Sequence, residues 1–369
     1  MGNFKRLESL DTLRGFDMLF IMGFASLVVA ICSLFPNGAD CGLAQQMGHV
    51  SWNGLRHHDT IFPLFLFIAG VSFPFSYAKQ CSNGASRGKI YWKIIRRGLV
   101  LFLFGLIYNG LLRFNFSHLR IWSVLGRIGV AWMLAALLSI NFKPKARAII
   151  AAVILLGYWF LCMIPATDVP GGDPLSMEGC LVGYIDRVLL GGNHILSRHI
   201  FDPEGTLSTL PAVVTAMLGM FTGEFVRCPE EKYSGNKKTL IMFAAAAVML
   251  VVGLVWNNWF PINKKLWTSS FVLVVGAYSL AMFALFYWII DVKGWNKWTL
   301  PFKVIGMNSI TIYMAPCIIS FDQAVKFLFG GVIGLVSEPV GNVIYGVCYL
   351  LVAWFFLYFL YKKNIFLKV

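Results

Sequence analysis

A succession of apolar runs, each about as long as a membrane-spanning helix, limits the folds open to this chain. Ten such runs lie at 12–35, 59–78, 95–112, 120–140, 147–164, 206–226, 239–257, 267–290, 302–320 and 341–361. Hydrophobic residues make up 58% of the chain and charged residues 13%, whereas soluble domains average about 45–50% and about 25%. One soluble core cannot bury this excess. The sequence therefore predicts an all-α polytopic membrane protein with about ten spans, forming a single domain over 1–369.

The distribution of Lys and Arg predicts how these spans are oriented. Basic residues collect in alternate connections, at Lys5 and Arg6, at Lys79, Arg87, Lys89, Lys93, Arg96 and Arg97, at Lys143, Lys145 and Arg147, at Arg227, Lys232, Lys237 and Lys238, at Lys293, Lys297 and Lys303, and at Lys362, Lys363 and Lys368. Since cytoplasmic connections carry such an excess, both termini are predicted to be cytoplasmic. The long loops 36–58 and 165–205 then lie on the outer side. A shorter apolar stretch, 324–336, is too short to span and is predicted to be re-entrant or interfacial.

The net charge of +14 does not indicate a nucleic-acid-binding protein, because the basic residues lie in short loops between apolar runs and form no compact patch. Eight cysteines are scattered without a Cys-x-x-Cys pair, which argues against a thiolate metal site. Cys41 and Cys180 both fall in predicted outer loops. Whether they form a disulfide is left open by the sequence.

Ionisable and polar groups inside the spans are functional candidates, because burying them in a bilayer is costly. Arg14 and Asp17, three residues apart, share one face of the first span. They form either an internal ion pair or part of a polar cavity that opens to the cytoplasm. Arg127 in the fourth span needs a partner or a wet cavity, and Asn308 lies beside Ser309 in the ninth span.

The densest polar cluster precedes the second span and contains His49, His57, His58 and Asp59. Three interpretations stay open for these histidines. They are the ligands of a zinc ion, a general base or acyl acceptor, or interfacial side chains that solvate a helix end.

Several motifs, in order along almost the whole chain, resemble those of the transmembrane heparan-α-glucosaminide N-acetyltransferases and their bacterial relatives. They are Leu10-Asp11-Thr12-Leu13-Arg14-Gly15, His49-Val50-Ser51-Trp52-Asn53-Gly54, Leu125-Gly126-Arg127, Gly183-Tyr184-Ile185-Asp186-Arg187, Asp202-Pro203-Glu204-Gly205-Thr206-Leu207, Pro261-Ile262-Asn263-Lys264-Lys265-Leu266-Trp267 and Gly306-Met307-Asn308-Ser309. The resemblance implies an inner-membrane acyltransferase. Family members take acetyl-CoA from the cytosolic side and acetylate a terminal glucosamine amine, as in heparan sulfate, on the opposite side.

The resemblance also implies roles for particular residues. The histidine of the His-x-Ser-Trp-Asn-Gly motif, His49 in this sequence, is the expected general base or acyl carrier, with Asp59 and Asn53 as its partners. The acceptor sugar is expected to contact Trp52, Asp186, Asp202, Glu204 and Asn308. The CoA phosphates are expected to bind Arg14, Arg96, Arg97, Arg127 and Lys303, without a metal ion. A homodimer is also expected from the resemblance.

One departure from the family pattern concerns the partner of the catalytic histidine. The eukaryotic relatives carry an Asn where Ala25 stands in this sequence. Either Asn53 or Asp59 takes over the polarising role, or the acceptor differs from glucosamine. The acceptor, the length of the acyl group and the choice between covalent and direct transfer are not fixed by the sequence.

A transporter for amino sugars or cell-wall sugars is the alternative function. The absence of an internal repeat in the sequence argues against it, since many transporters are built from inverted repeats. A purely structural membrane scaffold would leave His49, Asp59 and Arg127 without a purpose.

Overall fold

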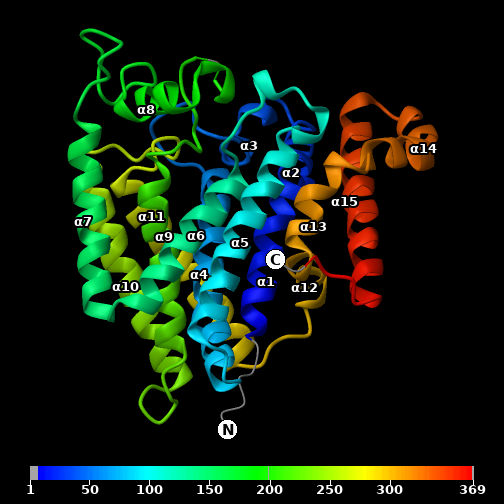
Figure 1. Cartoon of the computed structure of the whole chain (residues 1–369). Coiled ribbons are helices and arrows are strands. Elements are labelled where there is room, and N and C mark those ends of the chain that lie inside the picture. Colours follow the sequence, from blue (N-terminus) through cyan, green and yellow to red (C-terminus); the bar gives the residue numbers. More distant parts are fainter. Residues whose placement is uncertain (1–6, 198, 368–369) are drawn as a thin grey trace.

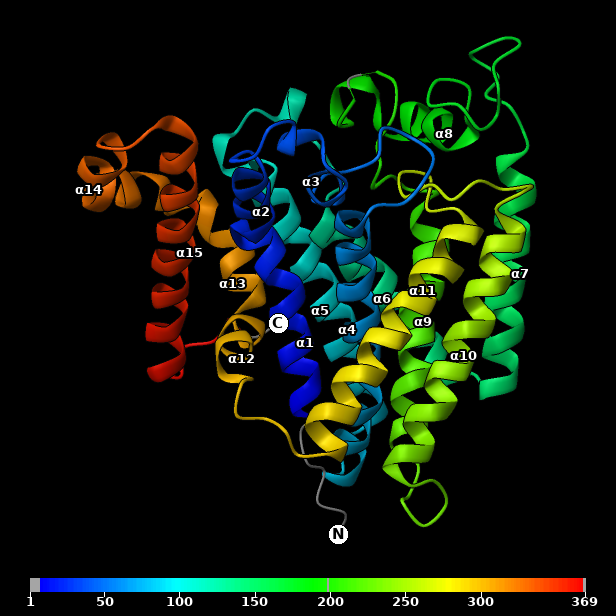
Figure 2. The same cartoon turned by 180° about the vertical axis from the view of Figure 1, so that it is seen from behind.

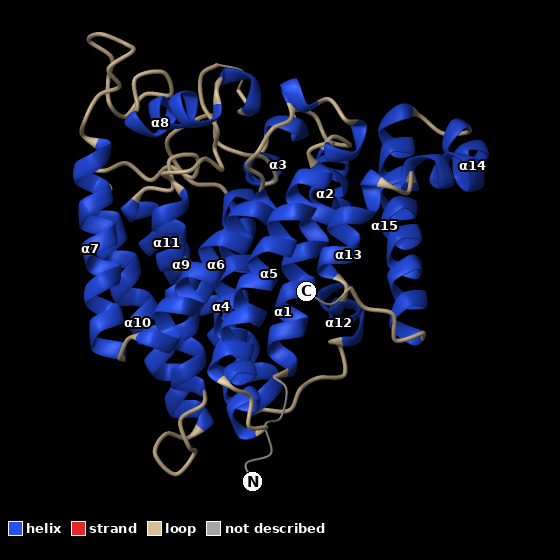
Figure 3. Cartoon of the chain, in the orientation of Figure 1, coloured by secondary structure: helices blue, strands red, loops and turns tan. Residues whose placement is uncertain are grey.

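The computed structural model describes residues 7–197 and 199–367, and these residues form helices and loops without a β-strand (Figure 3). The first half of the chain contains α1 (Glu8–Leu19), a π-helical turn η1 (Phe20–Phe24), α2 (Ala25–Cys32), η2 (Gly38–Asp40), α3 (Gly42–Gln46), α4 (His57–Ser82), α5 (Arg87–Tyr108), η3 (Leu111–Arg113), η4 (Phe116–His118), α6 (Val124–Asn141) and α7 (Pro144–Cys162). The second half contains α8 (Leu181–Leu190), η5 (Gly192–His194), α9 (Thr209–Val226), α10 (Gly235–Trp256), α11 (Ser269–Phe286), η6 (Tyr287–Val292), α12 (Leu300–Met307), α13 (Ser309–Met314), η7 (Ala315–Cys317), α14 (Phe321–Gly334) and α15 (Glu338–Lys362). The prediction of an all-α polytopic protein is confirmed.

Helices occupy all ten positions that the apolar runs predict. Among the described residues, eight helices are long and apolar enough to cross a membrane, or nine if one bent pair counts as a single span. Two predicted spans fall outside the eight. The first half of α5 carries five basic side chains, and the ninth predicted span is interrupted at Asn308 into α12 and α13.

The predicted re-entrant or interfacial segment corresponds to α14. The helix Ser309–Cys317 and α14 are bent by 79° against each other, so α14 does not continue the preceding span. In Figure 1, α14 lies at one edge of the bundle, beside the upper end of α15. Its exposed apolar side chains, Phe327, Leu328 and Val332, are typical of a helix in contact with lipid.

The two ends of the bundle differ in their loops (Figures 1 and 2). The loop face, defined by residues 33–56, 163–208 and 257–268, holds the two long segments that the sequence places outside. The basic face, defined by the connections 83–86, 142–143, 227–234 and 293–299, lies at the opposite end. This separation agrees with the charge pattern. Lys5, Arg6 and Lys368 lie outside the described residues.

Close packing in the centre depends on glycines where α4 crosses α9. A Cβ atom on Gly70 would lie 2.2 Å from the Ala216 carbonyl oxygen, and one on Gly219 would lie 2.1 Å from that of Phe67. In a membrane, where apolar side chains gain little by leaving lipid, this close backbone approach is a main source of helix association.

Replacing Gly219 with Ala is therefore expected to destabilise the protein by about 1–3 kcal/mol, because the two backbones must separate. Thermal unfolding in detergent measures the effect. Gly157→Ala in α7 is the matched control, since a Cβ atom at that position would meet nothing within 4 Å. The control should be neutral or slightly stabilising. An equal melting temperature for the two variants would contradict the proposed dependence on the α4–α9 contact.

Candidate active site

His49 lies on the loop face, in the segment that connects α3 to α4. Hydrogen bonds hold the backbone of this segment on both sides of His49. The Gly54 amide, at a φ of 116° that favours glycine, donates to the Ile262 carbonyl (2.8 Å), and the Arg56 guanidinium donates to the His49 carbonyl (3.1 Å). The His49 side chain remains 53% exposed. Its imidazole is thus fixed through the backbone and still open to a soluble molecule.

Asp59 orients the His49 ring. Its Oδ1 lies 2.7 Å from His49 Nδ1, while Oδ2 accepts from the Arg56 amide (3.1 Å) and the Val50 amide (3.4 Å). Only 1% of the Asp59 side chain is exposed, in the first turn of α4, so the carboxylate also caps this helix. When Nδ1–H donates to Asp59, the lone pair of the neutral ring lies on Nε2. No hydrogen bond among the described residues occupies Nε2, so the ring is arranged as a base.

Lys264 completes this group, although the sequence alone gives it no role. Its Nζ lies 3.4 Å from Asp59 Oδ1 and 3.1 Å from His49 Nδ1. Burial lowers the pKa of Lys264, although the neighbouring Asp59 carboxylate opposes that shift. A signal for this residue was present in the sequence. Lys264 and Lys265 are basic residues in a connection predicted to be outside, where the charge rule disfavours them.

A strained turn positions Lys264. Trp267 is fully buried with a φ of 55°, a left-handed conformation that is rare for large side chains. Asn263 Oδ1 accepts from the Leu266 amide (2.9 Å) and closes the turn. Such strain persists only where the surroundings enforce it, and it is often found at functional sites.

The other members of the His-x-Ser-Trp-Asn-Gly motif tie the loops together. Asn53 Oδ1 accepts from Asn263 Nδ2 (3.0 Å), and the Ser51 carbonyl accepts from Lys265 (2.6 Å). Trp52 Nε1 donates to the Leu175 carbonyl (2.7 Å), which joins the two long loops. The structure thus places Asp59, and not Asn53, against the imidazole. Ala25 is buried within α2.

The acids expected to contact an acceptor are mostly buried in ion pairs and turns. Arg120 donates to both oxygens of Asp202 (2.8 and 2.6 Å) and also to Glu204. Burial alone would lower the pKa of Arg120, but these hydrogen bonds raise it above its ordinary value. Asp202 is fully buried and Glu204 nearly so. This geometry points to stabilisation of the segment before α9 in place of the predicted contact with the acceptor.

Asp186 is fully buried as well. Its Oδ1 accepts from the Thr206 amide (2.8 Å), and a Cβ on Gly205 would lie 1.7 Å from its Oδ2. Burial raises the pKa of Asp186 to about 6, while the Thr206 amide opposes the shift. This carboxyl therefore holds the Asp202–Thr206 turn against α8.

The raised pKa of Asp186 predicts a pH-dependent stability. Between about pH 4 and pH 6 the unfolded chain has released this proton while the folded protein retains it, so stability falls as pH rises and levels off above 6. The contribution is roughly 3 kcal/mol at most. Melting curves in detergent from pH 4 to 8 should show a steeper decline for wild type than for Asp186→Asn. Parallel curves for the two proteins would contradict the assignment.

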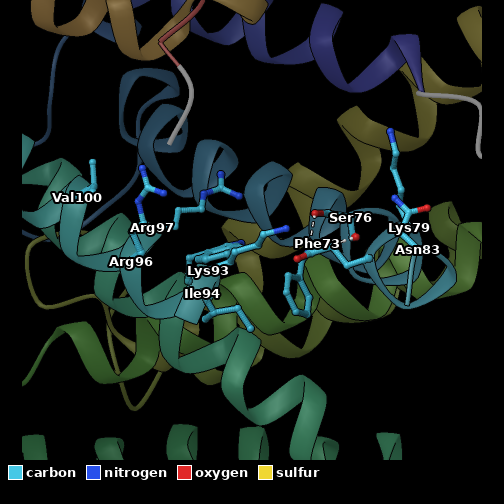
Figure 4. Close-up of a pocket in the computed structure, with 11 residues that line it drawn as sticks. Phe73, Ser76, Lys79, Asn83, Lys93, Ile94, Arg96, Arg97 and Val100 are labelled. Carbon is cyan, nitrogen blue, oxygen red and sulfur yellow. Dashed lines mark hydrogen bonds between the residues drawn. The ribbon is translucent and has the colours of Figure 1, made fainter. Parts of the chain in front are cut away.

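A second group of candidates lines a cavity of about 540 Å³ near the basic face, between α4 and α5. Figure 4 shows Lys93, Arg96 and Arg97 of α5 along one side and Ser76, Lys79 and Asn83, at the end of α4, along the other. Arg97 lies with its guanidinium carbon 4.2 Å from the Trp132 ring centroid, and its buried Nε has no hydrogen-bond partner among the described residues. Four cations without an acidic residue in the lining suit an anionic ligand.

A second, smaller chamber of about 150 Å³ adjoins this cavity on the side of the loop face. Both spaces share Arg97. The chamber is otherwise largely apolar, and it is lined by Arg14, Met18, Ile21, Phe62, Phe65, Ala69, Arg97, Leu101, Val124, Leu125, Ile128, Ser309, Ile310 and Tyr313. Arg14 thus belongs to the chamber, where it also contacts Asp11 (3.5 Å) and Ser72 (3.4 Å). The alternative ion pair with Asp17 is not formed, since one Asp17 oxygen is buried without a hydrogen-bond partner among the described residues.

The remaining predicted residues lie outside these two cavities. Arg127 is fully buried and donates to the Gly205 carbonyl (3.4 Å) and to Ser208, next to the Asp202–Thr206 turn. Lys303 pairs with Glu8 (3.1 Å) in a separate cavity at the basic face. Asn308 is buried at the junction of α12 and α13. The structure therefore brings together Arg14, Arg96 and Arg97 but separates Arg127 and Lys303 from them.

The cysteines and candidate metal ligands complete the description. Cys41 caps α3 through its sulfur, and Cys180 is buried with its thiol directed to the Met177 carbonyl; both are free. Over residues 7–197 and 199–367, no group of three or more His, Cys, Asp or Glu side chains is arranged to hold a metal ion.

The chain is similar to known membrane enzymes. The family model described as "Heparan-alpha-glucosaminide N-acetyltransferase, catalytic" matches residues 6–253. The heparan-alpha-glucosaminide N-acetyltransferases of Mus musculus and Homo sapiens are each 28% identical to this chain, over 99% of its length. The chain spans 60% of the length of these relatives. His49 and Asp59 lie within the residues that the family model matches, and Lys264 lies beyond them.

Proposed function

The chain belongs to the heparan-α-glucosaminide N-acetyltransferase family, and from this we propose that it is a transmembrane acetyltransferase that moves an acetyl group from acetyl-CoA at the basic face to an amino sugar at the loop face. One observation carries the proposal. A cationic cavity lies at one end of the bundle and an oriented, exposed histidine at the other, and an apolar chamber between α1, α4, α5, α6 and α13 adjoins the cavity at Arg97.

The donor site in this proposal is the cavity at the basic face. Lys79, Lys93, Arg96 and Arg97 would bind the phosphates of CoA, because each supplies a charge-assisted hydrogen bond. The apolar chamber suits the pantetheine arm. From Phe73 at the cavity to His58 at the loop end, α4 rises by about 22 Å, which an extended arm of this kind must cover. Lys303 and Arg127 take no part in this site.

The reacting group in the proposal is Nε2 of His49. An amino sugar is largely an ammonium ion at neutral pH, and it becomes a nucleophile only after losing a proton. With Asp59 accepting from Nδ1–H, His49 removes that proton and the free amine attacks the thioester carbonyl. Acetylation of Nε2 itself is the alternative route. We favour direct attack, because it needs one positioned base and no covalent intermediate.

Two further groups support the reaction. Lys264 stabilises the Asp59 carboxylate and thereby the ring orientation. Asn53 engages its side-chain oxygen with Asn263, so its amide N–H groups remain to stabilise the oxyanion of the tetrahedral intermediate. The acceptor approaches from the loop face, where Trp52 is its proposed contact.

The charge pattern supports an orientation with the basic face in the cytoplasm. A bacterial inner membrane, with the loop face in the periplasm, stays a prediction. The homodimer stays a prediction.

The proposal is tested with the protein in nanodiscs, labelled acetyl-CoA and glucosamine. Labelled N-acetylglucosamine is the expected product. Arg97→Gln is expected to weaken CoA binding about 10- to 100-fold, since a hydrogen bond to a charged group contributes about 1.5–3 kcal/mol. Lys145→Gln, at an exposed position of the basic face outside the cavity, is the control. Absence of product, together with glucosamine counterflow in CoA-free vesicles, would favour the transporter instead.

A further inference from the structure

His58 is the nearest aromatic neighbour of His49 and has no role so far. The two ring centroids are 4.7 Å apart in an edge-to-face arrangement. His58 is half-buried, and its Nδ1 is buried without a hydrogen-bond partner among the described residues. A buried polar atom without a partner costs free energy and calls for an explanation; Nδ1 of His57 is in the same condition, so the contact with His49 is what distinguishes His58.

The position of His58 on α4 directs it toward the chamber. Residues 58, 62, 65 and 69 follow one another at helical spacing and so share a face of α4. Phe62, Phe65 and Ala69 line the chamber. His58 lies one helical turn before Phe62 on this face, on the loop side of the chamber, and its ring contacts that of His49. Its neighbour His57 faces the other way and packs against Phe20 (4.5 Å) and Tyr278 (6.3 Å).

Acetyl transfer from a thioester has a second proton requirement besides the activation of the amine. When the carbon–sulfur bond breaks, the electron pair remains on sulfur as a thiolate. At the end of the apolar chamber this anion is poorly solvated, so a proton donor at that place lowers the barrier. His49 alone would have to reach both the amine and the sulfur with Nε2, because its Nδ1 is held by Asp59.

We propose that His58 passes a proton from His49 to the departing CoA thiolate; this inference rests on the proposed function. A neutral imidazole suits the task, since it carries one N–H donor and one acceptor nitrogen. His58 donates its N–H proton to sulfur and accepts one from the His49 imidazolium on its other nitrogen.

The proton count balances. The ammonium gives its first proton to His49, which releases it to solvent at the loop face. The amine nitrogen then forms its bond to the carbonyl carbon and gives a second proton to His49. That proton moves to His58, His58 protonates sulfur, and the carbon–sulfur bond breaks. The products are the N-acetyl sugar, CoA thiol and one proton.

The test uses the full chain in nanodiscs with acetyl-CoA and glucosamine. His58→Ala is expected to lower kcat about 10²-fold, a usual size for a proton-transfer group, with KM for acetyl-CoA changed less than about threefold. His58→Gln keeps the side-chain volume but cannot relay a proton, so its kcat should fall as much as that of His58→Ala. His57→Ala is the matched control on the opposite face of α4, and His49→Ala gives the background rate.

Added imidazole shows whether the loss of kcat in His58→Ala comes from lost proton transfer or from lost packing. Imidazole should raise the kcat of His58→Ala by about tenfold or more. Pyrrole, a ring of equal size without an acceptor nitrogen, should leave that kcat unchanged. Unchanged kcat in His58→Ala, rescue by both rings, or rescue by neither would overturn the proposal. A wild-type protein that does not acetylate glucosamine would remove the proposed function itself, and so the two failures are distinguishable.

Discussion

Replacing His49 with Ala is expected to lower kcat for acetyl transfer about 10³-fold while the protein stays folded and binds CoA normally. The expectation follows from the geometry, because His49 Nε2 is the base nearest the proposed meeting point of amine and thioester, and general bases typically contribute about 10²–10⁴-fold. Transfer is measured with labelled acetyl-CoA. CoA affinity, measured by calorimetry, should remain within about threefold of wild type, since the cationic cavity lies at the far end of the bundle.

The same variant separates the two chemical routes. With an acyl-imidazole intermediate, wild-type protein mixed with labelled acetyl-CoA alone would retain label, and the variant would not. With direct attack, neither protein retains label. Near-normal turnover of His49→Ala would contradict both routes and exclude this residue as the reacting group.

Replacing Asp59 with Asn is expected to lower kcat about 10²- to 10⁴-fold. The amide keeps the size of the carboxylate but no longer accepts from Nδ1–H with a full negative charge, and it can turn its own N–H toward the ring, which places the proton on Nε2. Two backbone amides also lose a charged acceptor at the start of α4, so the melting temperature should fall, by an amount typical of a weakened cap, about 1 kcal/mol.

Lys264→Met is a useful comparison for Asp59→Asn. It removes the charge beside the pair but leaves the Asp59–Nδ1 contact in place. A loss of activity clearly smaller than that of Asp59→Asn is expected. If Asp59→Asn retained most of the wild-type kcat, the carboxylate would be a helix cap alone.

The fold could be predicted to the extent that apolar run length determines it. Each of the ten runs contains helix, because a backbone in lipid must satisfy its hydrogen bonds internally. The break at Asn308 and the 79° turn before α14 were less accessible. Next to the break, α12 packs closely against α1, where a Cβ on Gly15 would lie 1.7 Å from the Phe302 carbonyl oxygen. Such a contact between distant segments leaves no periodic signal in the sequence.

The candidate site could be predicted in part. His49 and Asp59 are ten residues apart, the sequence indicates Asp59 as a partner of the histidine, and the structure places the two side chains together. Lys264 is 215 residues away from His49 in the sequence, and only the tertiary structure places the two side chains together. Asp186 and Asp202 belong to the motifs that carry the resemblance, and the sequence predicts that they contact the acceptor. Their burial beneath Arg120 and Thr206 is a property of packing that composition does not reveal.

Arg127 and Lys303 illustrate the same limit. Both are cations in or beside a span, and the cost of burying charge marks each as a candidate. Which cavity or partner a cation meets depends on helix rotation. Arg97 faces the cavity near Trp132, whereas Arg127 faces the Gly205 carbonyl and Lys303 faces Glu8.

Transfer of the acetyl group from a donor at the basic face to an acceptor at the loop face is the proposal on which the other roles depend. Sealed vesicles that hold the protein in one known orientation provide the decisive test, with acetyl-CoA on one side and glucosamine on the other. Acetylated sugar is expected only when acetyl-CoA meets the basic face and glucosamine meets the loop face. Product formed only when both substrates are supplied on the same side would rule out transfer across the membrane.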